Sequence, residues 1–165
     1  MKKQGFTLIE LMVVIVIMVI LAAVAVPKLF GMIAKSKASE VGPAAGTYIK
    51  LQEAYASEKT ALGNFAAIGY KSPGAGNGDS TTVFNYSAKK DVAGAWEAQS
   101  RVGLNDCQKG KKWGVMASFS ASTGNVTFEV GSDDETNCVT PLTPNFCNLA
   151  TNGSCKGSLP TGSGT

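Results

Sequence analysis

Residues 1–30 read MKKQGFTLIELMVVIVIMVILAAVAVPKLF, and this stretch decides the fold. Lys2 and Lys3 precede an apolar run in which Leu11 to Val26 includes no polar or charged residue. A membrane-spanning helix needs about 20 mostly apolar residues, whereas the apolar region of a secretory signal is about 7–15 residues long. Basic residues ahead of a first span tend to stay in the cytoplasm. The sequence therefore predicts a spanning helix with its N-terminus inside and the remaining chain outside.

Glu10 is unusual because it lies inside this apolar segment. A carboxylate at the centre of a membrane helix costs about 2.5–3.5 kcal/mol on insertion scales, so such a residue usually serves a function. Cleavage after Gly5 would make Phe6 the first residue, and its new α-amine would lie about one helical turn from Glu10. That amine could pair with Glu10 of its own chain or of a neighbour, and the second pairing would set the register between subunits. The alternative is a plain membrane anchor that tolerates an interfacial glutamate.

Residues 2–10, KKQGFTLIE, resemble the leader and cleavage site of type IV pilins and type II secretion pseudopilins, and the match continues through the apolar run to Pro27. The resemblance implies that Gly5 ends a leader removed by a prepilin peptidase and that the amine of Phe6 is N-methylated. It also implies that Glu10 neutralises the N-terminal amine of an adjacent subunit during assembly. Pro27 would kink or locally melt the helix.

The same resemblance implies an organisation and a role. The parts would be a cleaved leader (1–5), a transmembrane and assembly helix (6–30) and an extracytoplasmic head (31–165). The chain would be a structural subunit of a type IV pilus filament, made at the bacterial inner membrane as a prepilin and polymerised into a surface filament. Its partners would be copies of itself, the prepilin peptidase and methylase, the assembly machinery and, before assembly, membrane lipid. The alternatives are a type II secretion pseudopilin and an anchored binding domain that never polymerises.

A second helical pattern extends from Pro27 to about Leu62, with an interruption at Gly42-Pro43. One face of this stretch is apolar at spacings of three or four residues and comprises Val41, Ala45, Tyr48, Leu51 and Tyr55. Because the opposite face is polar, we expect this amphipathic half of the helix to pack on a sheet.

Strand patterns occupy the second half of the chain. Residues 83–86 and 96–102 are short candidates, and residues 63–82 form a glycine-rich loop. Residues 112–120 alternate, and residues 126–130 alternate after a Ser-Thr-Gly-Asn turn, so the two predict a hairpin with one buried face. The face of the first strand comprises Trp113, Val115, Ala117 and Phe119. Residues 157–165 have little to bury and are predicted to be mobile unless pinned.

All four cysteines lie in the part predicted to be outside the cytoplasm, where an even number favours disulfides. Four cysteines allow three pairings. We favour Cys107–Cys138, which would tie the start of the sheet to its end, and Cys147–Cys155, which would close a small loop. A four-thiolate zinc site is the rival, but no C-x-x-C pair exists. The predicted fold class is α+β and pilin-like: a long N-terminal helix, half transmembrane and half amphipathic, on a small antiparallel sheet with a disulfide-tied C-terminal loop region.

Histidine is absent, which removes the usual general base and the commonest metal ligand. A Ser-His-Asp or Cys-His catalytic device is therefore excluded, and no pattern groups the remaining polar residues into another device. We predict that the chain is not an enzyme and has no catalytic residue, no metal site and no cofactor. The net charge of +3 is too small to indicate nucleic-acid binding by itself.

Two charged segments leave further possibilities open. Asp133-Asp134-Glu135 offers oxygen ligands of the kind that calcium prefers, although the EF-hand spacing is missing. Residues 109–113, KGKKW, combine lysines with a tryptophan, so contact with DNA through its phosphates is conceivable. A solvated acidic turn and a solvated strand entry are the plainer interpretations.

Overall fold

The computed structural model describes residues 5–86 and 93–160. The chain divides into two compact units, Met1–Ile33 and Ala34–Thr165, which we call the N-terminal unit and the head. Lys2 and Lys3 of the predicted leader lie outside the described residues, as do residues 161–165 of the predicted mobile tail.

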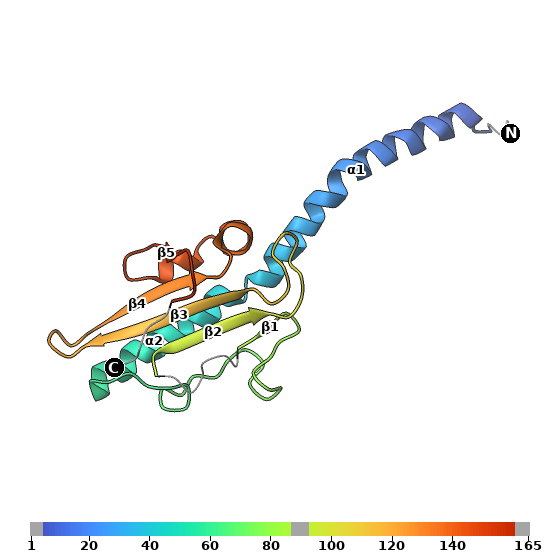
Figure 1. Cartoon of the computed structure of the whole chain (residues 1–165). Coiled ribbons are helices and arrows are strands. Elements are labelled where there is room, and N and C mark those ends of the chain that lie inside the picture. Colours follow the sequence, from blue (N-terminus) through green and yellow to red (C-terminus); the bar gives the residue numbers. More distant parts are fainter. Residues whose placement is uncertain (1–4, 87–92, 161–165) are drawn as a thin grey trace. The chain divides into compact units, whose positions relative to one another are not determined.

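The N-terminal unit is built on α1, which spans Leu8–Ala38 and continues into the head from Ala34 (Figure 1). The helical assignment runs through Pro27 without a break. Large apolar side chains from Phe6 to Ile33 are 42–85 % exposed. Among the described residues, the helical stretch beginning at Leu8 is the candidate membrane span. The predicted long apolar helix is confirmed, whereas the kink at Pro27 stays a prediction.

A turn at residues 39–40 separates α1 from α2, which spans Val41–Lys59. The interruption comes before Gly42-Pro43 because Pro43 lies in the first turn of α2, where its missing N–H needs no partner. The end of α2 comes earlier than the predicted Leu62. Thr60 adopts a left-handed conformation (φ 51°) there and stops the helix.

The buried face of α2 departs from the predicted face in its second half. The first three predicted positions are buried, whereas Leu51 and Tyr55 are only half-buried. Gln52 and Ala56 are buried in their place. In the orientation that satisfies both of its groups, the side-chain amide of Gln52 donates to the Gly63 carbonyl (3.2 Å) and accepts from the Gly63 amide (3.0 Å). A polar residue thus occupies an inner position because a distant backbone satisfies both of its groups.

The sheet has the order β1-β2-β3-β4-β5, and its neighbours are antiparallel except for the parallel pair β4 and β5 (Figure 1). β3 has the predicted bounds, and the predicted hairpin joins it to β4. β5 was not predicted, because two residues carry no alternation to detect. The strands are β1 (Phe84–Asn85), β2 (Ala95–Ser100), β3 (Lys112–Ser120), β4 (Asn125–Ser132) and β5 (Cys155–Lys156).

Short helical turns connect β4 to β5. They are a π-helical turn η1 (Glu135–Val139), a short helix α3 (Thr140–Leu142) and a 3₁₀ turn η2 (Phe146–Leu149).

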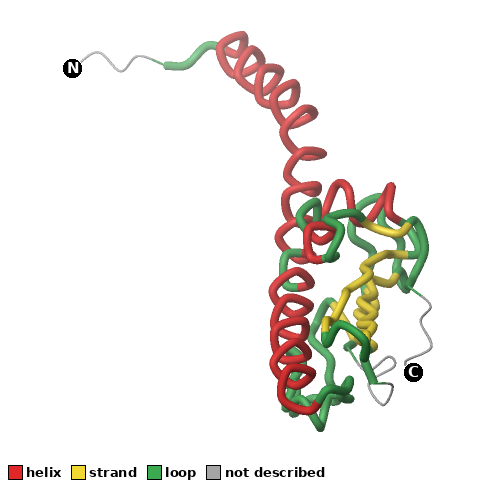
Figure 2. The backbone as a smooth tube through the Cα atoms, turned by 90° about the vertical axis from the view of Figure 1, so that its left-hand side faces the viewer, coloured by secondary structure: helices red, strands yellow, loops and turns green. Residues whose placement is uncertain are grey.

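The core of the head lies between α2 and the inner face of the sheet (Figure 2). Trp96 and Trp113, each at most 1 % exposed, are its largest side chains. The indole of Trp96 donates to the hydroxyl of Tyr70 (2.9 Å), and the indole of Trp113 donates to Thr143 Oγ1 (3.0 Å). Burial raises the pKa of Tyr70 to about 12. Both tryptophans are thus buried with their indole N–H groups hydrogen-bonded, as buried aromatic side chains with a polar atom usually are.

The outer face of the sheet is partly covered by the C-terminal tail. Gly114 and Gly131 are register partners on β3 and β4. A Cβ atom on Gly131 would lie 2.2 Å from the Ser158 carbonyl oxygen, and one on Gly114 would lie 3.1 Å from Leu159 Cδ2. Pro160 is buried. The sequence predicted mobility unless the segment was pinned, and residues 157–160 are the pinned part, because two glycines leave room (a notch) in which this segment packs.

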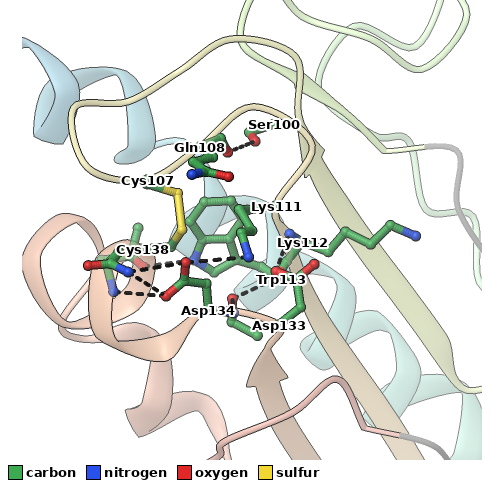
Figure 3. Close-up of a disulfide and its surroundings, with 12 residues drawn as sticks. Ser100, Cys107, Gln108, Lys111, Lys112, Trp113, Asp133, Asp134 and Cys138 are labelled. Atoms are coloured by element: carbon green, nitrogen blue, oxygen red, sulfur yellow. Dashed lines mark hydrogen bonds and ion pairs between the residues drawn. A yellow bond between two sulfur atoms is a disulfide. The ribbon is translucent and has the colours of Figure 1, made fainter.

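Two disulfides tie the C-terminal region. Cys107 pairs with Cys138 and Cys147 pairs with Cys155, which is the pairing favoured from the sequence. The first joins the loop before β3 to η1 (Figure 3). The second joins η2 to β5 and fixes the start of the C-terminal tail.

Candidate assembly site

The start of α1 is closed by a reciprocal pair of hydrogen bonds between Thr7 and Glu10. The Thr7 amide and the Thr7 hydroxyl both donate to Glu10 Oε2, at 2.8 and 2.7 Å. The Glu10 amide donates in return to Thr7 Oγ1 at 3.4 Å. This arrangement is a capping box, which satisfies amides that the first turn of a helix leaves without partners.

The capping box uses one of the two carboxylate oxygens of Glu10. Both donors from Thr7 reach Oε2, and in the described part of the chain no hydrogen bond or ion pair reaches Oε1. The side chain is exposed. Glu10 is thus oriented toward the beginning of the helix with an acceptor available for a further cation.

Gly5 and Phe6 precede the helix and have no regular secondary structure. Phe6 is 85 % exposed, and a Cβ on Gly5 would meet nothing within 4 Å. The predicted cleavage point is therefore open, and it lies one residue before the capping box. The T-x-x-E spacing of that box was present in the sequence, so Thr7 is a site residue that our sequence analysis missed.

The acidic segment after β4 is used by the head itself (Figure 3). Asp133 Oδ1 accepts from the Lys112 amide (2.9 Å), and Asp134 Oδ1 accepts from the Asn137 amide at the start of η1 (3.1 Å). Lys111 Nζ lies 3.4 Å from Asp134 Oδ2. The hydrogen bond from the Asn137 amide lowers the pKa of Asp134 below its ordinary value.

The described residues place Glu135 within 4.8 Å of Cys147 and Cys155, as a potential group of metal ligands. Both cysteines are joined in a disulfide, so neither supplies the thiolate that a metal ion would need. The carboxylates of Asp133 and Asp134 have the structural partners given above. No calcium-binding arrangement is therefore assembled from this segment in the part of the chain that the structure describes.

Comparison with known proteins places the N-terminal segment in a class. Residues 1–26 match the family model of the prokaryotic N-terminal methylation motif. This stretch contains Gly5, Phe6 and Glu10, so the class of protein is one that carries a methylation-type N-terminus.

A particular relative extends the match. The chain is 42 % identical over 77 residues to the type IV major pilin protein PilA of Myxococcus xanthus (strain DK1622). The aligned region covers 46 % of this chain and 34 % of the relative, so the chain spans about a third of the length of the curated relative it matches. No solved structure matches the chain. The motif and the relative together support the type IV pilin family.

Proposed function

We propose that the chain is the repeating structural subunit of a type IV pilus-like filament, with no catalytic role. The observation that carries this proposal is the N-terminal unit. It joins a methylation motif to an exposed apolar helix, and the first turn of that helix holds a glutamate with one oxygen left unused.

The precursor stage follows from the order of these parts. Lys2 and Lys3 hold the N-terminus in the cytoplasm while the apolar helix enters the inner membrane. A prepilin peptidase then cleaves between Gly5 and Phe6, which precede the helix and have no regular secondary structure. Methylation of the Phe6 amine leaves it cationic.

Assembly then depends on the carboxylate of Glu10. Thr7 holds Oε2, so Oε1 accepts a charge-assisted hydrogen bond from the Phe6 amine of a neighbouring subunit. Pairing between chains neutralises both charges away from water. It also gives each new subunit one defined axial position relative to the last.

The energetics explain why one charge pair matters among so many apolar contacts. Lipid tails are as apolar as leucine side chains, so moving α1 from the bilayer into a bundle of helices gains little hydrophobic free energy. An unpaired carboxylate in an apolar setting is costly, and its pairing favours the assembled state. The apolar helix thus supplies the filament core, and Glu10 supplies the register.

A pilus subunit is preferred over a type II secretion pseudopilin because the matched relative is named a major pilin. The filament would stand on the cell surface, and the two disulfides of the head suit an oxidising exterior.

The test compares Glu10→Gln with the wild type in the cells that express the chain. Glu58→Gln is the matched control, because Glu58 is an exposed glutamate whose ion pair, among the described residues, is with its neighbour Lys59. Mass spectrometry of the mature N-terminus should give N-methylated Phe6 in all three chains. Surface filaments sheared from the cells should fall at least tenfold in Glu10→Gln alone.

Two results would contradict the proposal. An intact Met1 in the mature protein would show that the leader is not cleaved. Normal filaments from Glu10→Gln would show that assembly does not depend on pairing between Glu10 and the Phe6 amine. Thr7→Val removes the hydroxyl that donates a hydrogen bond to Glu10. This variant should give an intermediate filament yield, because the carboxylate is held less firmly but keeps its charge.

A further inference from the structure

A polar groove of about 550 Å³ lies on the head, where β1, the end of β2 and the turn before β3 meet. Two cationic residues, Arg101 and Lys109, line it, and among the described residues no acidic side chain does. Its other polar lining groups are hydroxyls and amides from Thr82, Asn85, Gln99 and Ser100.

The residues of the basic segment 109–113 differ in their burial and in their ion-pair partners. The side chain of Trp113 is fully buried in the core. Lys112 Nζ lies 2.8 Å from Glu97 Oε1, and Lys111 Nζ pairs with Asp134 (Figure 3). Lys109 is exposed and forms no ion pair in the described part of the chain. Of this segment, Lys109 therefore keeps its charge available for a ligand.

Arg101 is held at the groove by two bonds to the segment before β1. Its amide donates to the Val83 carbonyl (2.7 Å), and its Nη1 donates to the Thr81 carbonyl (2.6 Å). These acceptors are neutral, so the charge of the guanidinium is not cancelled. A guanidinium held in this way offers its remaining donors to a carboxylate with little further loss of entropy.

We propose that this groove binds the carboxylates of an acidic polysaccharide. The hydroxyl and amide groups beside the two cations suit the hydroxyls of a sugar. Nucleic acid is disfavoured because, in the described part of the chain, no aromatic side chain lines the groove to stack on bases, and Trp113 is buried. A pair of cations also falls short of the extended row of contacts that a phosphate backbone uses.

A filament would repeat this groove along its length and so strengthen binding to a long polymer. This step rests on the proposed function. A single exposed pair of cations binds weakly in salt. A polymer of subunits presents the groove many times to a polymer of uronic acids, and multivalent contact can raise the apparent affinity by about 10²–10⁴-fold.

The experiment measures binding of polygalacturonate, a polymer of uronic acid, to the full chain as filaments and as detergent-solubilised subunits. The test variant is Arg101→Gln with Lys109→Gln, and the matched control is Lys50→Gln, which removes an exposed cation from α2. Neutral dextran and duplex DNA are the comparison polymers. Arg101→Lys keeps the charge and should retain most of the binding.

Wild-type and Lys50→Gln filaments should bind polygalacturonate at least tenfold more tightly than the double variant, and detergent-solubilised subunits should rank in the same order at lower affinity. Equal binding by the double variant would overturn the proposal. So would equal loss in Lys50→Gln, or tighter binding of duplex DNA than of polygalacturonate. If no filaments form, the proposed function fails, but the ranking of the solubilised subunits still decides whether the groove binds uronates.

Discussion

In the N-terminal unit the large apolar side chains from Phe6 to Ile33 are 42–85 % exposed, whereas Trp96 and Trp113 of the head are at most 1 % exposed. The head completes its burial within one chain. In our proposal, the N-terminal unit buries its apolar side chains against other molecules, first lipid and then other subunits. Apolar side chains therefore favour folding stability in one region and association in the other.

The largest expected difference comes from removing one large apolar side chain from each region. Trp113→Ala should destabilise the head by about 3–5 kcal/mol, because it leaves a cavity and frees the hydroxyl of Thr143. Ile17→Ala, in the exposed helix, should change the free energy of head unfolding by less than about 0.5 kcal/mol. Denaturant unfolding of the full chain in mild detergent measures both, and similar losses would break the comparison.

The two disulfides should differ in their contribution to the head. Cys107–Cys138 closes a sequence separation of 31, and Cys147–Cys155 closes one of 8. On the loop-entropy estimate, replacing the first pair by serines costs about 3.7 kcal/mol and replacing the second costs about 2.5 kcal/mol. Thermal unfolding of the two double variants under non-reducing conditions tests this order, and a reversed order would show that the C-terminal tail depends on its disulfide more than entropy predicts.

Two glycines of the head should respond in opposite directions to a methyl group. Gly131→Ala should destabilise the head by about 1–3 kcal/mol, because its Cβ meets the Ser158 carbonyl, and should increase proteolysis near residues 157–160. Gly46→Ala in α2 has only an ordinary contact with Leu149 at 3.9 Å and should stabilise the helix by up to about 1 kcal/mol. Limited proteolysis and unfolding midpoints distinguish the two, and a tail unaffected by Gly131→Ala would show that the notch does not hold it.

The smallest expected effect is a dependence on pH. The pKa of Asp134 is lowered in the folded head, chiefly by the hydrogen bond from the Asn137 amide. The unfolded state therefore binds a proton first as the pH falls. The contribution is complete above the unfolded pKa of about 3.9 and is lost as the pH falls through the lower folded pKa.

Asp134→Asn keeps a capping oxygen but does not titrate. The difference in unfolding free energy between wild type and Asp134→Asn should therefore shrink by less than about 1 kcal/mol between pH 6 and pH 2, as expected for one cap. Unfolding curves across this range measure it. A difference that stays constant with pH would contradict the role given to the carboxylate.

Much of the fold could be predicted because its signals are local. The apolar run, the alternation of β3 and β4 and the even cysteine count each lie in the sequence pattern. The bounds of α2 and the inward position of Gln52 could not be predicted in the same way. Gln52 is buried because the backbone of Gly63 satisfies its amide, and no spacing along the helix reports that contact.

The candidate assembly site shows a different kind of omission. The predicted roles of Gly5, Phe6 and Glu10 came from the resemblance to pilins, but the role of Thr7 was overlooked although the T-x-x-E pattern was visible. The T-x-x-E spacing is a known local motif, and it is sufficient to predict the capping box from the sequence.

By itself, the sequence predicted the features of the N-terminal unit: a helix long and apolar enough to span a membrane, a carboxylate inside it and a candidate cleavage point before it. These are properties of neighbouring residues, and helix geometry converts their spacing directly into position. Only the tertiary structure decided that Gly114 and Gly131 form a notch for the tail and that Arg101 and Lys109 share one groove. Strand register pairs Gly114 with Gly131, and the connection between β2 and β3 brings Lys109 to the same groove as Arg101. Register is set by the packing of the whole core.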